Sequence, residues 1–280
     1  MFISPSHLAA GVSLSAVGVW GTSDFLGGLG SRRANAFLFT SAAHLSAMIF
    51  AASLALAVRL PFPEGRSLGW ALAAGAMGGC ALAFFYRALA SGKMGLIAPV
   101  AAVLSAAIPT IFTAFSEGFP GWRHVGGFVL AGIGVWLISR TENGGRPEGL
   151  LTAVLAGCGF AGFYLCIHQA GAGSALWIAV YSRFASLMMT LAFVIVGGLM
   201  APLPGRIAAV AAVAGILDIT GSALFIRAEQ IGRLDSAVVL SSLYPAVTVL
   251  LARIFLHEHF SRARTVGMLA ALAAVPMIAG

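Results

Sequence analysis

The sequence predicts an all-α, polytopic membrane protein with about ten transmembrane helices arranged as two inverted five-helix repeats. Three observations predict it: an apolar composition, a succession of apolar runs and an internal duplication. Of the 280 residues, 60% are hydrophobic and only 9% are charged, whereas roughly a quarter of the residues in a soluble domain carry charge. Lipid is therefore the expected solvent for most of this chain.

The apolar runs give the individual helices. A helix needs about 20 mainly apolar residues to cross the hydrocarbon core of a bilayer. Runs of about this length between polar or Pro/Gly-rich breaks predict helices at residues 8–30, 35–58, 68–90, 95–115, 122–139, 149–169, 175–198, 206–229, 235–256 and 263–280. No Lys or Arg precedes the first run, so it lacks the basic front end of a cleaved signal peptide and we interpret it as a retained helix.

The breaks divide the predicted helices into two groups of five. The longest hydrophilic stretch, residues 140–148, lies almost halfway and has the Gly, Pro and charge content of a linker. A shift of about 140 residues places Phe85–Lys93 over Phe225–Arg233, which keeps a Phe, an Arg-Ala pair, a Gly and a basic residue in register. Residues 1–141 and 142–280 are therefore predicted to be repeats. Because five is odd, the second repeat starts on the opposite side of the membrane, which gives inverted topology.

The same duplication places polar residues at related helix ends. Glu117 precedes Gly126 by nine residues, and Glu258 precedes Gly267 by the same distance. Ion pairs in the loops or anchoring at the membrane interface are the favoured interpretations of these acids.

Charge and spacing exclude several classes of function. The net charge is +7, but the basic residues lie between apolar runs, which suits anionic lipid headgroups rather than nucleic acid. The three cysteines show no CxxC spacing and the sequence has no HExxH motif, so no metal site is expected. Without a phosphate-binding glycine pattern, no cofactor is expected and transport driven by ATP is disfavoured.

Several segments together resemble a known family. They are Trp20–Phe25 with its Trp-Gly pair, the arginine-bearing Ser182–Phe184, and Pro245 followed by Glu258 and Gly267. In these segments and in its ten duplicated helices, the chain is similar to the EamA-type permeases of the drug/metabolite transporter superfamily. The resemblance implies a carrier of small solutes with cytoplasmic termini. The distribution of Arg and Lys over the loops instead favours termini outside, so the orientation stays open.

Ionisable side chains at bilayer depth mark the candidate site, because they are costly unless they pair or line a path. Asp24 lies one turn after Trp20, and a carboxylate beside an indole could bind an amino-bearing substrate or carry a proton. A structural role for Asp24 is equally favoured. Asp218 is expected in the cavity or in an ion pair.

Arg183 and His44 occupy corresponding repeat positions. Arg183 needs a partner, and a structural pair with Asp218 or Asp24 is favoured over a substrate anion. For His44, burial with one hydrogen bond is favoured over a proton relay. Tyrosines add recognition, so the candidate substrate-binding or coupling residues are Trp20, Asp24, His44, Tyr86, Tyr164, Arg183, Asp218 and Tyr244.

These features predict a secondary transporter rather than an enzyme. The expected cargo is a small amphipathic metabolite such as an amino acid, exported by alternating access with or without coupling to protons. An intramembrane enzyme acting on lipid and a non-transporting partner subunit are the alternatives. We expect a multi-pass protein of a cell membrane, such as a bacterial inner membrane, surrounded by lipid and present as a monomer or homodimer.

Overall fold

The computed structural model describes residues 4–62, 65–91, 94–139, 149–256 and 262–278, and within these ranges the chain is helical and has no strand. The helices are α1 (Pro5–Ser31), α2 (Ala36–Ala57), α3 (Arg66–Ser91), α4 (Met94–Ser116), α5 (Trp122–Ser139), α6 (Leu150–Ala170), α7 (Ala175–Val196), α8 (Gly205–Ile231), α9 (Leu234–Ser241), α10 (Tyr244–Leu256) and α11 (Arg262–Ile278). The predicted all-α fold class is confirmed. Lys93, Glu258 and the 140–148 linker lie outside the described residues.

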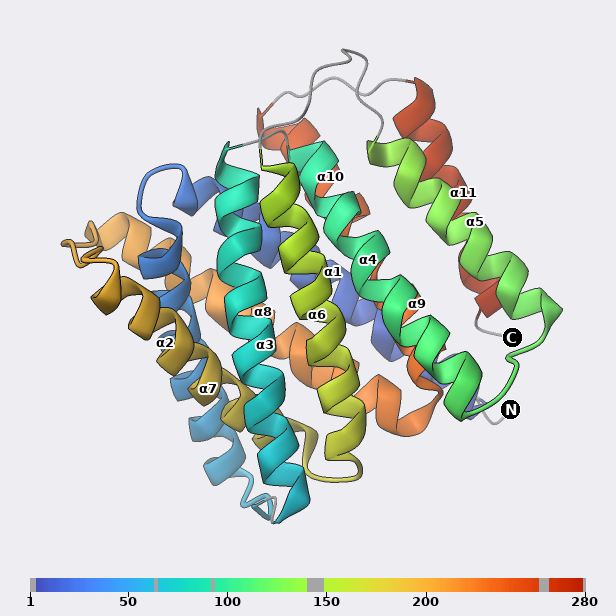
Figure 1. The fold of residues 1–280 in the computed structure, drawn as a ribbon, viewed down its shortest axis with the longest axis horizontal. Helices are drawn as coiled ribbons and strands as arrows, with labels where there is room; N and C mark the ends of the chain where they lie inside the picture. The colour runs from blue at the N-terminus through green and yellow to red at the C-terminus, as the bar shows by residue number, and fades with distance from the viewer. Residues whose placement is uncertain (1–3, 63–64, 92–93, 140–148, 257–261, 279–280) are drawn as a thin grey trace.

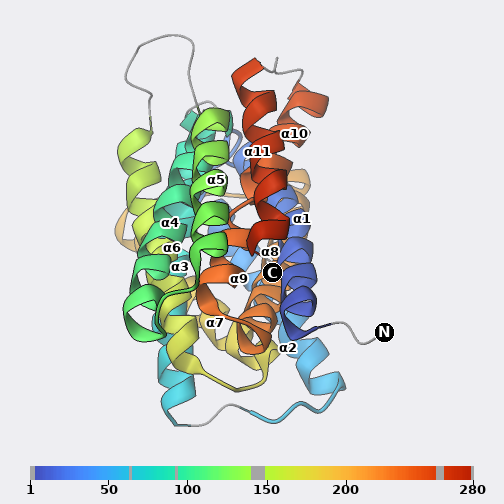
Figure 2. The ribbon, with the colours of Figure 1, turned by 90° about the vertical axis from the view of Figure 1, so that its right-hand side faces the viewer.

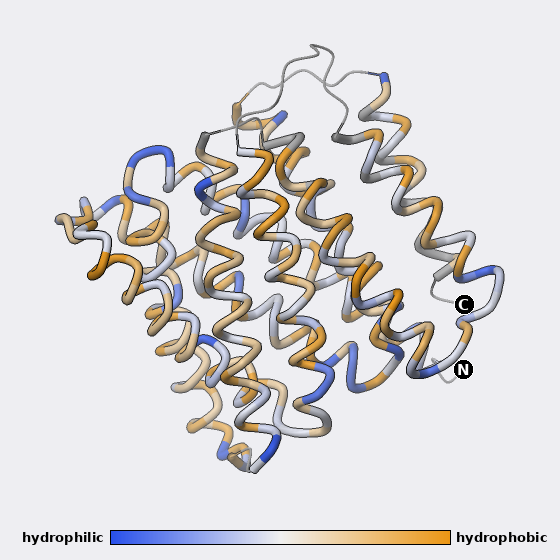
Figure 3. The backbone as a smooth tube through the Cα atoms, in the orientation of Figure 1, coloured by the Kyte–Doolittle hydropathy of each residue, from blue (hydrophilic) through white to orange (hydrophobic). Residues whose placement is uncertain are grey.

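The outer surface of the bundle is apolar. Six spans in the described part of the chain are long and apolar enough to cross a membrane. Figure 3 shows hydrophobic colours along the helices, with strongly hydrophilic colours concentrated at their ends and connections. Large aromatic side chains point outward, with Phe115 89% exposed and Trp122 81% exposed. Such exposure is expected where lipid covers the protein, so the chain is a polytopic membrane protein.

The ninth predicted helix differs from the prediction, because it is broken into α9 and α10. Pro245 has no N–H to donate, and its ring would clash with the carbonyl of Ser241 in a continuous helix. The helix tightens before the break, where the Leu243 N–H donates to the Leu240 carbonyl at 3.2 Å. As a result α9 ends at Ser241 and α10 begins at Tyr244.

Helices from before residue 140 pack mainly on helices from after residue 148. α1 packs on α8, α2 on α7, α3 on α6 and α5 on α11. In Figure 1 the α2–α7 pair forms one flank and the α5–α11 pair the other, with α1, α3, α6 and α8 between them; Figure 2 shows the same bundle from the α5–α11 side. The core of the molecule therefore lies between the two parts of the sequence.

Small residues allow the closest of these contacts. A Cβ added to Gly75 would lie 2.0 Å from the Ser182 carbonyl oxygen, and one added to Gly79 would lie 2.5 Å from the Ser186 Cα. The Ser186 hydroxyl donates to the Gly75 carbonyl at 2.8 Å across the same contact. Gly75 and Gly79 thus form the small-residue seam through which α3 approaches α7.

Candidate functional site

A buried cavity lies among α1, α3, α6, α7, α8 and α10. Its lining combines charged, hydroxyl and aromatic groups and consists of Trp20, Asp24, Gly78, Leu82, Phe160, Phe163, Tyr164, Arg183, Asp218, Ser222 and Tyr244. About 40 Å³ is open to water-sized molecules. Because each water needs roughly 10–15 Å³ on this measure, the cavity has room for about three waters. A metabolite is larger than this, so it could bind only if the cavity widened.

Sequence reasoning found most of the polar lining. Of the eight candidate residues, the lining includes Trp20, Asp24, Tyr164, Arg183, Asp218 and Tyr244. It missed Ser222, although this residue lies one helical turn after Asp218 and therefore on the same face. The missed Gly78, Leu82, Phe160 and Phe163 are apolar residues among many, so spacing alone did not distinguish them.

Arg183 is held by a partner on the next helix. Its Nη2 lies 3.0 Å from Asp218 Oδ2, and the same nitrogen donates to the Ser222 hydroxyl. Both charged residues are buried, with Arg183 4% and Asp218 6% exposed. A buried charge that keeps an opposite charge at this distance avoids most of the cost of leaving water. The expected pair between Arg183 and Asp218 is thus present, and it joins α7 to α8.

Asp24 differs from Arg183 and Asp218 in its contacts. It is 6% exposed and lines the cavity, yet within the described part of the chain its carboxylate has no ion pair and no hydrogen bond. The neighbouring Trp20 is fixed, because its Nε1 donates to the Asp218 carbonyl at 3.1 Å. Among the described residues, the cavity therefore presents the carboxylate of Asp24 without an ion pair, beside a fixed indole.

Aromatic rings form the wall next to these groups. The ring centroid of Tyr164 lies 6.3 Å from that of Trp20 and 4.7 Å from that of Phe225. The Tyr244 hydroxyl and the Arg183 Nε are both buried without a hydrogen-bond partner among the described residues. These two donors are available to a bound solute, since buried polar groups are otherwise almost always satisfied.

Two candidate residues lie outside the lining. The Tyr86 hydroxyl is 3.2 Å from the Ser23 hydroxyl, which donates to the Ala214 carbonyl at 2.8 Å, so Tyr86 connects α3, α1 and α8. His44 is fully buried on α2, and neither ring nitrogen has a hydrogen-bond partner in the described ranges. The single hydrogen bond expected for His44 is therefore not found.

Comparison with known proteins gives one family and one fold. The sequence profile of the EamA-like transporter family matches residues 147–280. A solved structure described only as "Crystal structure of protein" aligns over 96% of this chain and 95% of its own, with a TM-score of 0.76 and 18% sequence identity. At that identity the likeness establishes the fold alone. No curated protein matches the sequence.

Proposed function

Residues 147–280 belong to the EamA-like transporter family, and from this premise we propose that the protein is a secondary transporter that moves a small amphipathic metabolite by alternating access. The family match agrees with the resemblance stated from sequence and indicates a membrane transporter of the drug/metabolite type. The observation that carries the more specific proposal is the buried cavity lined by the carboxylate of Asp24, which has no ion pair among the described residues.

Inverted repeats provide the mechanism in this proposal. If the halves are related, α1 corresponds to α6, α2 to α7, α3 to α8 and α5 to α11, and each helix contact must have a counterpart between the corresponding helices. The contact between α1 and α8 then corresponds to that between α6 and α3. The contact between α3 and α7 corresponds to that between α8 and α2, and all four contacts occur. The α2–α7 and α5–α11 pairs map onto themselves. This pattern supports two inverted repeats that rock about the cavity between them.

The charges of the cavity favour an amino-bearing cargo. Arg183 and Asp218 neutralise each other, so the carboxylate of Asp24 gives the lining a net negative charge when it is ionised. An ammonium group would bind Asp24, and the rings of Trp20 and Tyr164 would cover an apolar body. In an amino acid, the carboxylate would accept from the unpartnered Nε of Arg183. We therefore propose an amino acid or a related amine as the substrate.

The same carboxylate could couple transport to the exchange of the substrate for a proton. Asp24 can hold a proton or an ammonium group, and holding both would leave one positive charge buried without a partner. A proton entering from one side would displace the substrate to the other. The resemblance to the EamA-type permeases favours export as the direction of net transport.

The test is flux through purified protein reconstituted in liposomes. A panel of amino acids, amines and uncharged solutes of similar size is measured with and without an imposed pH gradient. We expect amino-bearing solutes to move and a pH gradient to accelerate them. Uncharged solutes moving as fast, or no solute moving through well-folded protein, would count against the proposal.

Replacement of the carboxylate sharpens this test. Asp24→Asn keeps the shape of the side chain but removes its charge, so flux is expected to fall about tenfold or more, the effect of losing at least one charge-assisted hydrogen bond. The remaining flux should no longer respond to a pH gradient. A variant with normal flux and normal pH response would show that Asp24 is not the coupling residue.

A further inference from the structure

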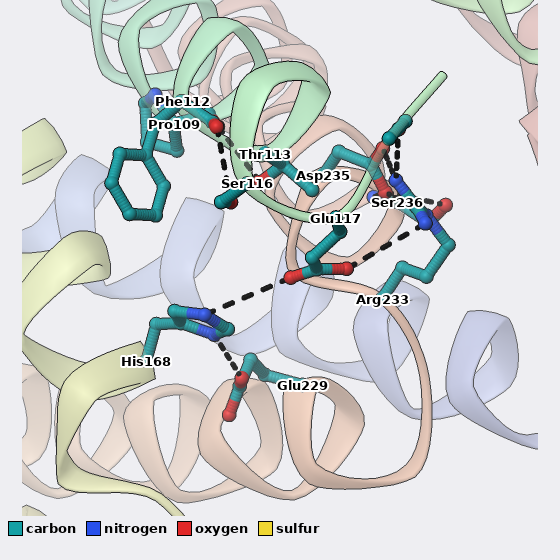
Figure 4. Close-up of polar contacts among 11 residues, drawn as sticks. Pro109, Phe112, Thr113, Ser116, Glu117, His168, Glu229, Arg233, Asp235 and Ser236 are labelled. Carbon is teal, nitrogen blue, oxygen red and sulfur yellow. Dashed lines mark hydrogen bonds and ion pairs between the residues drawn. The ribbon is translucent and has the colours of Figure 1, made fainter. Parts of the chain in front are cut away.

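Five charged or ionisable side chains gather away from the cavity, at the end of the bundle where α1 begins. They are Glu117, His168, Glu229, Arg233 and Asp235, which we call the end network (Figure 4). Glu117 directly follows α4, while His168 and Glu229 lie in the last turns of α6 and α8. Arg233 and Asp235 lie at the start of α9. A cavity lined by both Ser6 and Arg233 places the start of α1 at this same end.

The end network is continuous. His168 Nδ1 is 2.8 Å from Glu229 Oε1 and its Nε2 is 3.7 Å from Glu117 Oε1. The other oxygen of Glu117 lies 3.6 Å from Arg233 Nη1, and Arg233 Nη2 is 3.0 Å from Asp235 Oδ2. Hydrogen bonds to Asp235, together with the charges of Asp235 and Glu117, raise the pKa of Arg233, so it stays charged.

Glu117 is the member that joins the two halves of the sequence. The four other members follow residue 148, so every contact of Glu117 within the network crosses between the halves. The Arg233 guanidinium adds a further crossing by donating to the Gly118 carbonyl at 3.3 Å. If one half rocks against the other, these contacts are among those that must separate at this end, together with the hydrogen bond from Trp177 Nε1 to the Leu60 carbonyl.

The network is suited to reversible opening. The side chains of Glu117, His168 and Arg233 are between 26% and 35% exposed, and ion pairs at such positions contribute little to stability because water replaces the lost contacts. None of the five residues lines the central cavity. Changes here should therefore alter access to the site without altering its lining.

We propose that the end network is the gate that closes the transport pathway at the end where α1 begins, and that the contacts of Glu117 dissociate before a solute passes there. The inference rests on the proposed transport function. It adds to that function a named closure, built of ion pairs across the two halves and distinct from the substrate site.

The first experiment measures how readily a reagent reaches the cavity and does not require the protein to transport a solute. In a chain whose native cysteines are replaced by serine, Leu82→Cys places a thiol in the cavity lining, and a membrane-impermeant maleimide is applied from the side of the chain termini. Adding Glu117→Gln should raise the labelling rate about two- to fivefold, the population shift expected from loss of a partly exposed ion pair. Arg59→Gln is the matched control, because Arg59 is an exposed residue of the loop that follows α2 at the same end.

The second experiment locks the gate. Glu117→Cys is combined with Arg233→Cys, and the two thiols are bridged by a bifunctional methanethiosulfonate reagent that spans the gap left by the longer native side chains, since a direct disulfide needs much closer Cα atoms. Cross-linking should stop solute exchange, and reduction should restore it. Full exchange by the cross-linked protein would overturn the proposal, as would equal labelling in the Glu117→Gln and Arg59→Gln proteins. Increased labelling in a protein that moves no solute would retain the gate and refute the transport function.

Discussion

The three charged side chains of the cavity have different neighbours. Arg183 and Asp218 satisfy each other across α7 and α8, whereas Asp24 faces the cavity without an ion pair among the described residues. Each charge of the Arg183–Asp218 pair is needed to neutralise the other. An unpaired one is retained at an energetic cost, which is why Asp24 is the residue we assign to substrate or proton binding.

This difference predicts opposite effects on stability. Asp218→Asn leaves the buried guanidinium of Arg183 without its counter-charge, and loss of one partner of a buried pair costs about 3–5 kcal/mol. Asp24→Asn removes an unpaired buried charge, so thermal stability should stay equal or increase. Melting temperatures of both purified variants in the same detergent check this. A large loss of stability in Asp24→Asn alone would mean that Asp24 has the structural role.

Individual residues of the cavity could be identified from the sequence where their type was rare. Asp24, Arg183 and Asp218 could be identified because charge is exceptional inside apolar runs, and their spacing placed them near bilayer depth. Tyr86 was identified as an aromatic residue with a polar tip, and in the structure its hydroxyl links α3 to α1 through Ser23. The rotation of a helix about its axis decides whether a side chain lines the cavity or packs in the core. This rotation depends on neighbouring helices, which a single sequence does not specify.

Between α1 and α10 the backbones approach closely at Gly21. A Cβ added there would lie 2.5 Å from Val247 Cβ and 2.6 Å from the Tyr244 carbonyl oxygen. The Thr248 hydroxyl donates to the Gly21 carbonyl at 3.1 Å across the same contact. The position of Tyr244 at the cavity thus depends on the absence of a side chain on α1.

Replacing this glycine should therefore displace α10. Gly21→Ala is expected to cost about 1–3 kcal/mol, the usual penalty for overpacking, and to lower flux because Tyr244 moves. Gly18→Ala is the matched control on the same helix, since an added Cβ there meets nothing within 4 Å. Flux and melting temperature are compared for both variants. Equal behaviour of the two proteins would contradict the proposed packing.

Helices were largely predictable, and their interruptions were not. Ten apolar runs gave the helix positions, but Pro109 lies inside a continuous α4, whereas Pro245 lies in the first turn of α10, directly after the break from α9. Both residues lack the N–H of a helical hydrogen bond. Whether a proline bends or breaks a membrane helix depends on which neighbours satisfy the freed backbone groups, and this is a property of the packed bundle.

Across the whole molecule, the halves depend on each other for burial. Because α1, α2, α3 and α5 pack on helices from the second half, neither half should fold stably by itself. Co-expression of residues 1–141 and 142–280 as separate chains should yield a complex that purifies through a tag on one half and transports solute. Each half expressed alone should be degraded or aggregate. Recovery of either half as a stable, monodisperse protein would contradict this account.

The arrangement of the halves was the least accessible from sequence. The duplication predicted two related units, but many ways of joining two five-helix units would satisfy a repeat. The packing of α3 on α7 is set by side-chain shapes, as in the seam of Gly75 and Gly79 against α7. The end network also escaped prediction as a unit, because its members are separated by up to 118 residues along the chain, from Glu117 to Asp235.

The pairing of α1 with α8 also has a consequence for biogenesis. The ribosome delivers α1 to the membrane long before α8 exists, so Asp24 and the Ser23 hydroxyl, which later donates to the Ala214 carbonyl of α8, first face lipid or the insertion machinery. An ionisable side chain at bilayer depth is costly until it is paired or buried within protein. The first half therefore exposes polar groups of α1 during synthesis, and these groups are covered only when α8 has been made.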